Sequence, residues 1–129
     1  MSPDEAMQRI DVVMAHAWMV RNFLKHADEI QEDEEMLDVH RGIFDFIRAT
    51  EPAWQRQDAT EYLHRVRGKL GKLRRVSEYL SREWRRVSTH TNFEMAAKSL
   101  AGCVRHIEEI VAAVPKPGTA GEVAPGEGG

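Results

Sequence analysis

The strongest constraint on the fold of this chain is the spacing of its apolar residues, which recur every three or four positions along most of the sequence. Such spacing gathers apolar side chains on one side of an α-helix. A half-buried strand would need strict alternation instead, and no stretch of the sequence alternates in that way. Four stretches carry the helical spacing, and capping residues or prolines separate them. The sequence therefore predicts an all-α protein.

The first stretch opens with Ser2-Pro3-Asp4-Glu5, which offers a serine N-cap, a proline at the first helical position and a glutamate for a capping box. We expect this helix to run to about Ile30. The second helix is expected from about Glu34 to Ala49, because Thr50-Glu51-Pro52 is typical of a helix end. The inward rows of the two helices are Ile10, Val13, Ala17, Val20, Leu24 and Ala27, and then Met36, Leu37, His40, Ile43, Phe44 and Ile47.

Asp58 is the expected cap of a third helix that runs to about Arg86, and Thr91-Asn92-Phe93-Glu94 forms the capping box of a fourth, which ends before Pro115. Short links between amphipathic helices favour antiparallel neighbours. We therefore expect an up-and-down antiparallel four-helix bundle over residues 1–114. The inward rows are Ala59, Leu63, Val66, Leu70, Leu73, Leu80, Trp84 and Val87, and then Phe93, Ala97, Leu100, Val104, Ile107, Val111 and Val114.

The last fifteen residues differ in composition from the rest of the chain. Pro115–Gly129 holds five of the nine glycines and three of the five prolines, and Val123 is its one large aliphatic residue. Such a segment buries too little apolar surface to offset the entropy of ordering it. We expect residues 115–129 to form a disordered tail.

The overall composition narrows the class of protein. A single cysteine excludes an internal disulfide, and no apolar run approaches the roughly 18 residues of a membrane span. The first residues lack the basic and apolar regions of a signal peptide. We expect a cytoplasmic protein that neither spans nor binds a membrane. No phosphate-binding loop, nucleophile elbow or pair of facing acids points to an enzyme or a cofactor.

Charge is distributed unevenly. Seven acidic residues and no basic one lie between Asp28 and Asp38, whereas nine Lys or Arg residues and two glutamates lie between Arg65 and Arg86. In an up-and-down bundle the first and third links share one end. The acidic corner (Asp28, Glu29, Glu32, Asp33, Glu34 and Glu35) should then lie near Arg82, Arg85, Arg86 and His90. The longer third helix is expected to overhang the second and to carry its last arginines beyond these acids.

The outward side of the third helix is the main candidate binding surface. A turn of 100° per residue places six cations and two glycines there, and glycine costs a helix about 1 kcal/mol against alanine. Two interpretations stay open: a charged face that only keeps the bundle soluble, or a notch that admits a partner or a phosphate backbone. The set of candidate binding residues is Arg65, Gly68, Gly71, Lys72, Arg75, Arg82, Arg85 and Arg86, joined by Trp18, which lies off the inward row of the first helix.

The six histidines and the cysteine give little sign of a metal or catalytic centre. Glu61 and His64 match the Glu-x-x-His spacing of di-iron bundles, but they face outward and no second motif accompanies them. We expect no metal site. His40 lies within the apolar row of the second helix, where a hydrogen-bonded core histidine is the expected role. Cys103 is expected to be a small core residue.

Arg85 and His90 have the spacing Arg-x-x-x-x-His, which resembles the motif of HEPN-type ribonucleases, a family of small helical bundles. The resemblance implies that His90 acts as acid or base on an RNA 2′-hydroxyl and that Arg85 steadies the phosphate. It covers two residues, and Arg86-Val87-Ser88-Thr89 between them lacks the polar residue that often follows the arginine.

Three functions follow as hypotheses. We expect a non-enzymatic helical module that binds another macromolecule, either a protein partner or a second copy of itself. The first alternative is an RNA-binding bundle or HEPN-like ribonuclease that uses the basic face of the third helix. The second is a metal-binding bundle.

Overall fold

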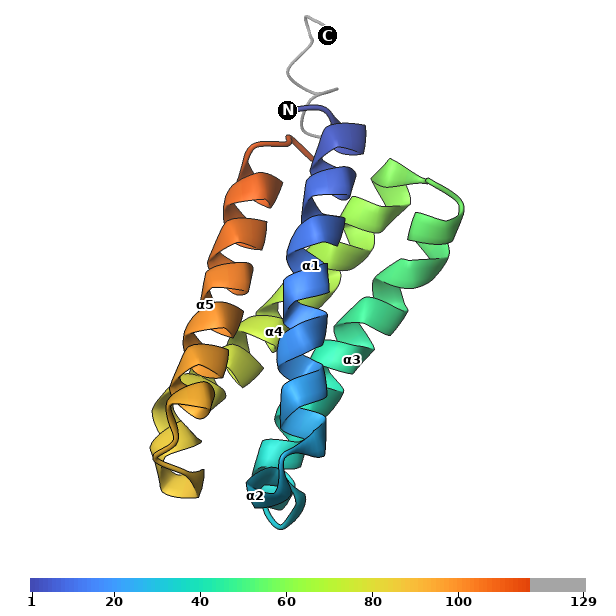
Figure 1. Ribbon diagram of the computed structural model, residues 1–129. Coiled ribbons are helices and arrows are strands. Elements are labelled where there is room, and N and C mark those ends of the chain that lie inside the picture. Colours follow the sequence, from blue (N-terminus) through green and yellow to red (C-terminus); the bar gives the residue numbers. More distant parts are fainter. Residues whose placement is uncertain (117–129) are drawn as a thin grey trace, which may run out of the picture.

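The computed structural model describes residues 1–116, and these residues form five helices and no strand (Figure 1). The helices are α1 (Pro3–His26), α2 (Asp28–Gln31), α3 (Glu34–Gln55), α4 (Ala59–Val87) and α5 (Thr91–Ala112). The all-α prediction is confirmed for this part of the chain. The predicted tail, residues 115–129, lies outside the described residues except for Pro115 and Lys116.

Four of the five helices begin at side-chain caps that satisfy backbone N–H groups left free in the first turn. Ser2 accepts from the N–H of Glu5 at 3.1 Å, and Asp58 accepts from that of Glu61 at 3.1 Å. Both caps were predicted. Asp33 caps α3 by accepting from the N–H of Met36 at 3.0 Å.

The predicted capping box at Thr91 is wrong by one residue. Nδ1 of His90 accepts from the N–H of Asn92 at 3.1 Å, so His90 is the N-cap and Thr91 is the first residue of α5. A neutral imidazole nitrogen carries a lone pair like a hydroxyl oxygen, and it can therefore take the capping role usually assigned to serine or threonine.

The first predicted helix is interrupted. α1 ends at His26, Ala27 is extended, and a single further turn forms α2. The side-chain amide of Gln31 donates to the carbonyl of Lys25, which satisfies one acceptor that the break leaves free. The change of direction places Ile30 in the core, where it is fully buried. Burial of this side chain accounts for the break.

The second predicted helix is longer than expected, because α3 continues through Pro52 to Gln55. Proline removes one backbone donor and normally ends a helix. Here Ala53 is buried and the Trp54 ring packs on Tyr62 with ring centroids 6.2 Å apart. The packing of this last turn outweighs the missing hydrogen bond.

Contacts at the two ends show how the helices are connected in space. Near the start of α1, Gln8 donates to Gln57 in the link between α3 and α4 at 3.0 Å. At the same end, Arg67 donates to the carbonyl of Val114 after α5 at 2.8 Å. At the opposite end, Arg86 near the end of α4 pairs with Asp33 before α3 at 2.6 Å. Consecutive links therefore lie at opposite ends, as the ribbon also shows (Figure 1).

The core lies between α1, α3, α4 and α5, each of which packs on two main neighbours in the cycle α1–α3–α4–α5. The predicted inward rows supply most of it, including Leu73 and Leu100. Some residues of the rows are only partly buried, because they lie at helix ends or at the edges of the rows: Trp84, Val87, Phe44, Leu37 and Ile47. The rows missed Met7 and Tyr62, which are buried at the end of the molecule where the chain begins.

Among residues 1–116, no helix is both long enough and apolar enough to cross a membrane.

Candidate functional site

The predicted binding residues of α4 do lie on its outer surface. Arg65, Gly68, Lys72, Arg75, Arg82, Arg85 and Arg86 are exposed, and Gly71 is half-exposed. Several of these cations have acidic partners. Arg65 pairs with Glu61 at 2.7 Å, and Lys72 lies 3.7 Å from Asp45 of α3. The face that is basic in sequence is thus partly neutralised in space, and each exposed pair contributes little to stability.

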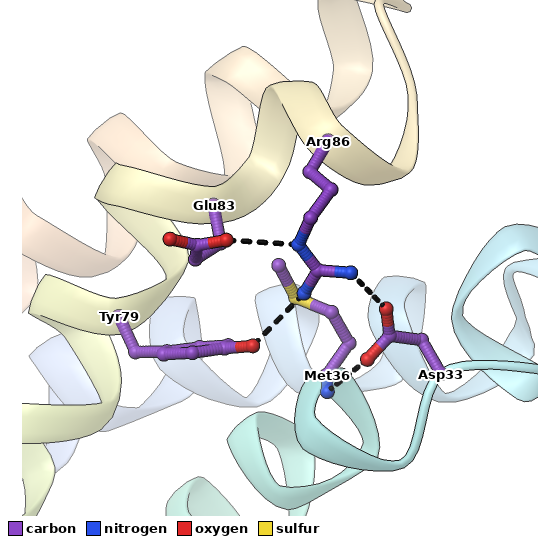
Figure 2. A network of polar contacts seen from close by, with 5 residues as sticks. All are labelled: Asp33, Met36, Tyr79, Glu83 and Arg86. Carbon is purple, nitrogen blue, oxygen red and sulfur yellow. Dashed lines mark hydrogen bonds and ion pairs between the residues drawn. The ribbon is translucent and has the colours of Figure 1, made fainter.

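Arg86 is the most extensively bonded cation of α4 (Figure 2). Its guanidinium pairs with Asp33 at 2.6 Å and with Glu83 at 2.8 Å, and it donates to the hydroxyl of Tyr79 at 2.9 Å. The hydrogen bond from Arg86, together with that from the N–H of Met36, lowers the pKa of Asp33. One arginine therefore joins the end of α4 to the cap of α3.

This network corrects the expectation that the last arginines of α4 overhang the acidic corner. The expectation assumed a second helix that ended near Ala49, but α3 reaches Gln55 and the two helices are more nearly matched. Arg86 meets Asp33, whereas Arg82 lies over the ring of Tyr79 at 5.8 Å and Arg85 lies over Trp84 at 4.9 Å. Neutralisation of the acidic corner thus involves one of the three arginines.

Arg85 and His90, the two residues that resemble a ribonuclease motif, have separate structural roles. Arg85 stacks on Trp84, and Nδ1 of His90 holds the first turn of α5 through the N–H of Asn92. That lone pair is occupied, which leaves Nε2 as the remaining ring nitrogen for proton transfer. The catalytic role of the two residues stays a prediction.

Gly68 and Gly71, the two glycines among the predicted binding residues, border open space. A Cβ added at Gly68 meets nothing within 4 Å, and one added at Gly71 meets only the Arg75 guanidinium at 3.7 Å. Gly68 borders a groove of about 600 Å³ that is also lined by His64, Arg67 and Lys116. The glycine that needs its small size is Gly42, which no sequence pattern singled out. A Cβ there would lie 2.9 Å from Cγ1 of Val76 on α4.

Exposed large apolar side chains gather on two helices. In the described chain these residues are Met1, Val12, Trp18, Met19 and Met95, all on or directly before α1 except Met95 of α5. Met19 is 64% exposed and Met95 is 47% exposed. They border a groove of about 310 Å³ between α1 and α5, floored by Phe23 and Ala96. We call Val12, His16, Met19, Phe23 and Met95 the α1–α5 patch.

The α1–α5 patch carries no fixed charge, although 30% of all residues in the chain are charged. The eight residues that line its groove include no lysine, arginine, aspartate or glutamate. Phe23 packs edge-on against Phe93 with ring centroids 5.1 Å apart, which fixes the floor of the groove. Depletion of charge around exposed apolar side chains is typical of the centre of a protein interface.

A second cluster surrounds Trp18, the one predicted binding residue outside α4. Trp18 is 39% exposed, and its ring lies 4.5 Å from the guanidinium carbon of Arg21. Arg21 is 8% exposed and also faces the ring of Phe44 on α3 at 4.8 Å. Arg21 was not among the residues selected from the sequence, and its burial was not predicted. Its spacing of four from Ala17 and three from Leu24 could have revealed it, because both neighbours belong to the inward row.

His40 lies near this cluster and departs from its predicted role. Its Nδ1 is buried but has no hydrogen-bond partner among the described residues. Burial lowers the pKa of His40, and the nearby charges of Arg21, Arg41 and Lys25 lower it further. The prediction of a hydrogen-bonded core histidine is therefore wrong. His40 is half-buried, lies near positive charges and has no partner at Nδ1 among the described residues.

Cys103 is a core residue, as predicted. The thiol is buried, lies 3.6 Å from the carbonyl oxygen of Val13, and has its pKa raised by burial, so it is a poor nucleophile. Within residues 1–116, no group of three or more histidine, cysteine, aspartate or glutamate side chains is placed to hold a metal ion.

Fold and surfaces together define a class: a helical protein with an uncharged apolar patch on α1 and α5, and with a partly paired basic face on α4. Comparison with known proteins adds no family to this description, since no family model, curated protein or solved structure matches the chain.

Proposed function

We propose that the four long helices form an up-and-down antiparallel four-helix bundle, and that this bundle is a non-enzymatic assembly module. It binds a second copy of itself through the α1–α5 patch. Links at alternating ends support the topology. One observation carries the function: the exposed Met19 of α1 and Met95 of α5 border a groove without fixed charge.

The lack of charge is what favours a second copy as the occupant. A two-fold interface places the same patch on both sides, so a patch with charges of one sign would face the same sign across the axis. The α1–α5 patch avoids this repulsion. Its groove accepts a flexible apolar side chain, and Met19 and Met95 protrude on either side of it. Methionine side chains adapt their shape easily, which suits reciprocal insertion across such an interface.

The test is the molar mass of the protein in solution, measured by light scattering from about 10 µM to about 1 mM, where small interfaces dissociate. We expect the mass to rise toward that of a dimer. Met19→Glu places a like charge on both sides of the interface and in an apolar groove, and it should keep the protein monomeric throughout. The matched control is Ser81→Glu, an equal charge change at an exposed position of α4. A wild-type protein that stays monomeric at the highest concentration refutes the proposal.

The RNA-binding alternative is kept for one observation, the open groove beside Gly68 on the basic face of α4. Phosphate contacts weaken steeply as salt rises, whereas apolar self-association does not. Binding of a short single-stranded RNA that falls steeply between low and moderate salt, and that is lost in Lys72→Gln/Arg75→Gln, would favour this alternative.

A further inference from the structure

The surroundings of Arg21 are unusual for a buried arginine. Arg21 is at least nine-tenths buried, its Nε has no hydrogen-bond partner, and it forms no ion pair with any acid of the described residues. A buried charge normally has a paired acid, because leaving water is costly. The rings of Trp18 and Phe44 offset part of this cost by facing the cation.

Other positive charges lie on the same edge of the molecule as Arg21. Lys25 follows one helical turn later on the same side of α1. Across the α1–α3 edge, Arg48 lies 5.6 Å from the Phe44 ring that Arg21 also faces. The one acid that acts on His40, Asp38, is already paired with Arg41 at 3.2 Å. This edge of the molecule therefore carries an uncompensated positive charge around a guanidinium held in a fixed position.

We propose that Arg21, with Lys25 and His40, forms a binding site for a phosphate group at the α1–α3 edge. Two cations and a histidine without an acidic partner match a doubly charged phosphate better than a singly charged carboxylate. The guanidinium already faces the Phe44 ring of α3 at 4.8 Å before the ligand arrives, which limits the side-chain entropy lost on binding.

Access to the site depends on Trp18. Its ring covers one side of the Arg21 guanidinium and is itself 39% exposed. Rotation of this surface side chain uncovers the cation, and a ligand that carries an aromatic ring can stack on the indole in exchange. The site lies away from the α1–α5 patch, so it is independent of the proposed function and can fail without it.

Inorganic phosphate is the probe, added at constant ionic strength to the full-length protein, with acetate as the comparison anion. Two NMR signals report on the site: Nε–H of Arg21 and the ring of His40. We expect saturable shifts with phosphate and much smaller ones with acetate. Bound phosphate should also raise the pKa of His40, because its negative charge offsets the positive charges of Arg21 and Lys25 on α1, which lower that pKa. The effects of Arg41 and Asp38 on α3 should stay the same.

Three variants identify the contacts. Arg21→Met keeps the shape of a buried side chain and should weaken phosphate binding by more than about tenfold, the effect of losing a charged hydrogen bond. Lys25 is exposed, so Lys25→Gln tests the site without endangering the fold, and it should weaken binding about two- to fivefold. Lys98→Gln on α5 is the control and should change nothing.

A short single-stranded RNA distinguishes the source of the phosphate. If inorganic phosphate binds and RNA does not compete for Arg21, the ligand is a phosphate monoester. Competition by RNA that is lost in Arg21→Met identifies a nucleic-acid backbone at the same site. Equal shifts with acetate and phosphate, or unchanged phosphate affinity in both Arg21→Met and Lys25→Gln, overturn the proposal.

Discussion

Arg86 joins parts of the chain that are far apart in sequence. Its guanidinium contacts Asp33, Glu83 and Tyr79, and Asp33 in turn caps α3 (Figure 2). A charged hydrogen bond to a cap does two things at once: it keeps the carboxylate ionised and it holds that carboxylate where it can accept from the helix. The other arginines of this turn, Arg82 and Arg85, lack such a role.

Arg86→Gln should therefore lower the melting temperature at neutral pH, whereas Arg82→Gln should leave it close to wild type. Because Asp33 has a lowered pKa, its stabilising contribution is present above the ordinary value of 3.8 and is lost as pH falls through the lowered value. The difference between Arg86→Gln and wild type should then shrink on acidification, and added salt should reduce it. Thermal unfolding followed across pH measures both trends. An equal effect of the two variants would contradict this account of the network.

The role of a single residue could be predicted from the sequence only where that role depends on nearby residues. The caps Ser2 and Asp58 and the burial of Cys103 could be predicted, because each depends on neighbours within one or two turns. The roles of Arg86 and Arg21 could not, since each depends on a side chain from another helix. His40 was placed in the right row, but its lack of a partner at Nδ1 depends on what α1 brings opposite it.

At the scale of elements, the close approach of α3 and α4 depends on Gly42. Val76 of α4 occupies the space where a side chain on Gly42 would begin. Val76 is β-branched and has few rotamers, so it cannot easily move aside. Gly68, in contrast, faces open space on the outer side of α4. Two glycines within long helices thus have opposite structural roles.

This contrast gives a paired prediction. Gly68→Ala should stabilise the protein by about 0.5–1 kcal/mol, the gain expected for alanine over glycine inside an exposed helix. Gly42→Ala should destabilise it, by about 1–3 kcal/mol, because overpacking against Val76 exceeds the same propensity gain. Urea unfolding of the two variants measures both changes. Stabilisation by Gly42→Ala would show that α3 and α4 can separate at no cost.

The presence of each long helix was predicted from the sequence more reliably than the residues at which the helices end. All four long helices were predicted by the spacing of apolar residues, which reports burial directly. The break at Ala27 and the extension of α3 past Pro52 were missed, because both are determined by tertiary burial of Ile30, Ala53 and Trp54. Local signals such as a proline give way where packing contributes more.

At the scale of the whole molecule, the surfaces divide by helix. The outer face of α4 carries the basic residues, several of them paired with α3 or with their own helix. The α1–α3 edge carries unpaired cations around Arg21, and the α1–α5 patch carries exposed methionines without fixed charge. The outer face of α4 could be predicted as a candidate surface, because the charges along one helix can be recognised in its sequence. A patch formed by two helices that are distant in sequence cannot be recognised in that way.

If the α1–α5 patch binds a second copy, the methyl groups of the six methionines should report the binding. Their NMR signals, recorded while the protein is concentrated, report separately on the patch and on the rest of the molecule. We predict that Met19 and Met95 shift with concentration and that the buried Met7, Met14 and Met36 do not. Met1, exposed but outside the patch, controls for unspecific association. Shifts at Met1 equal to those at Met19 and Met95, or no shift at either patch methionine, would contradict the account.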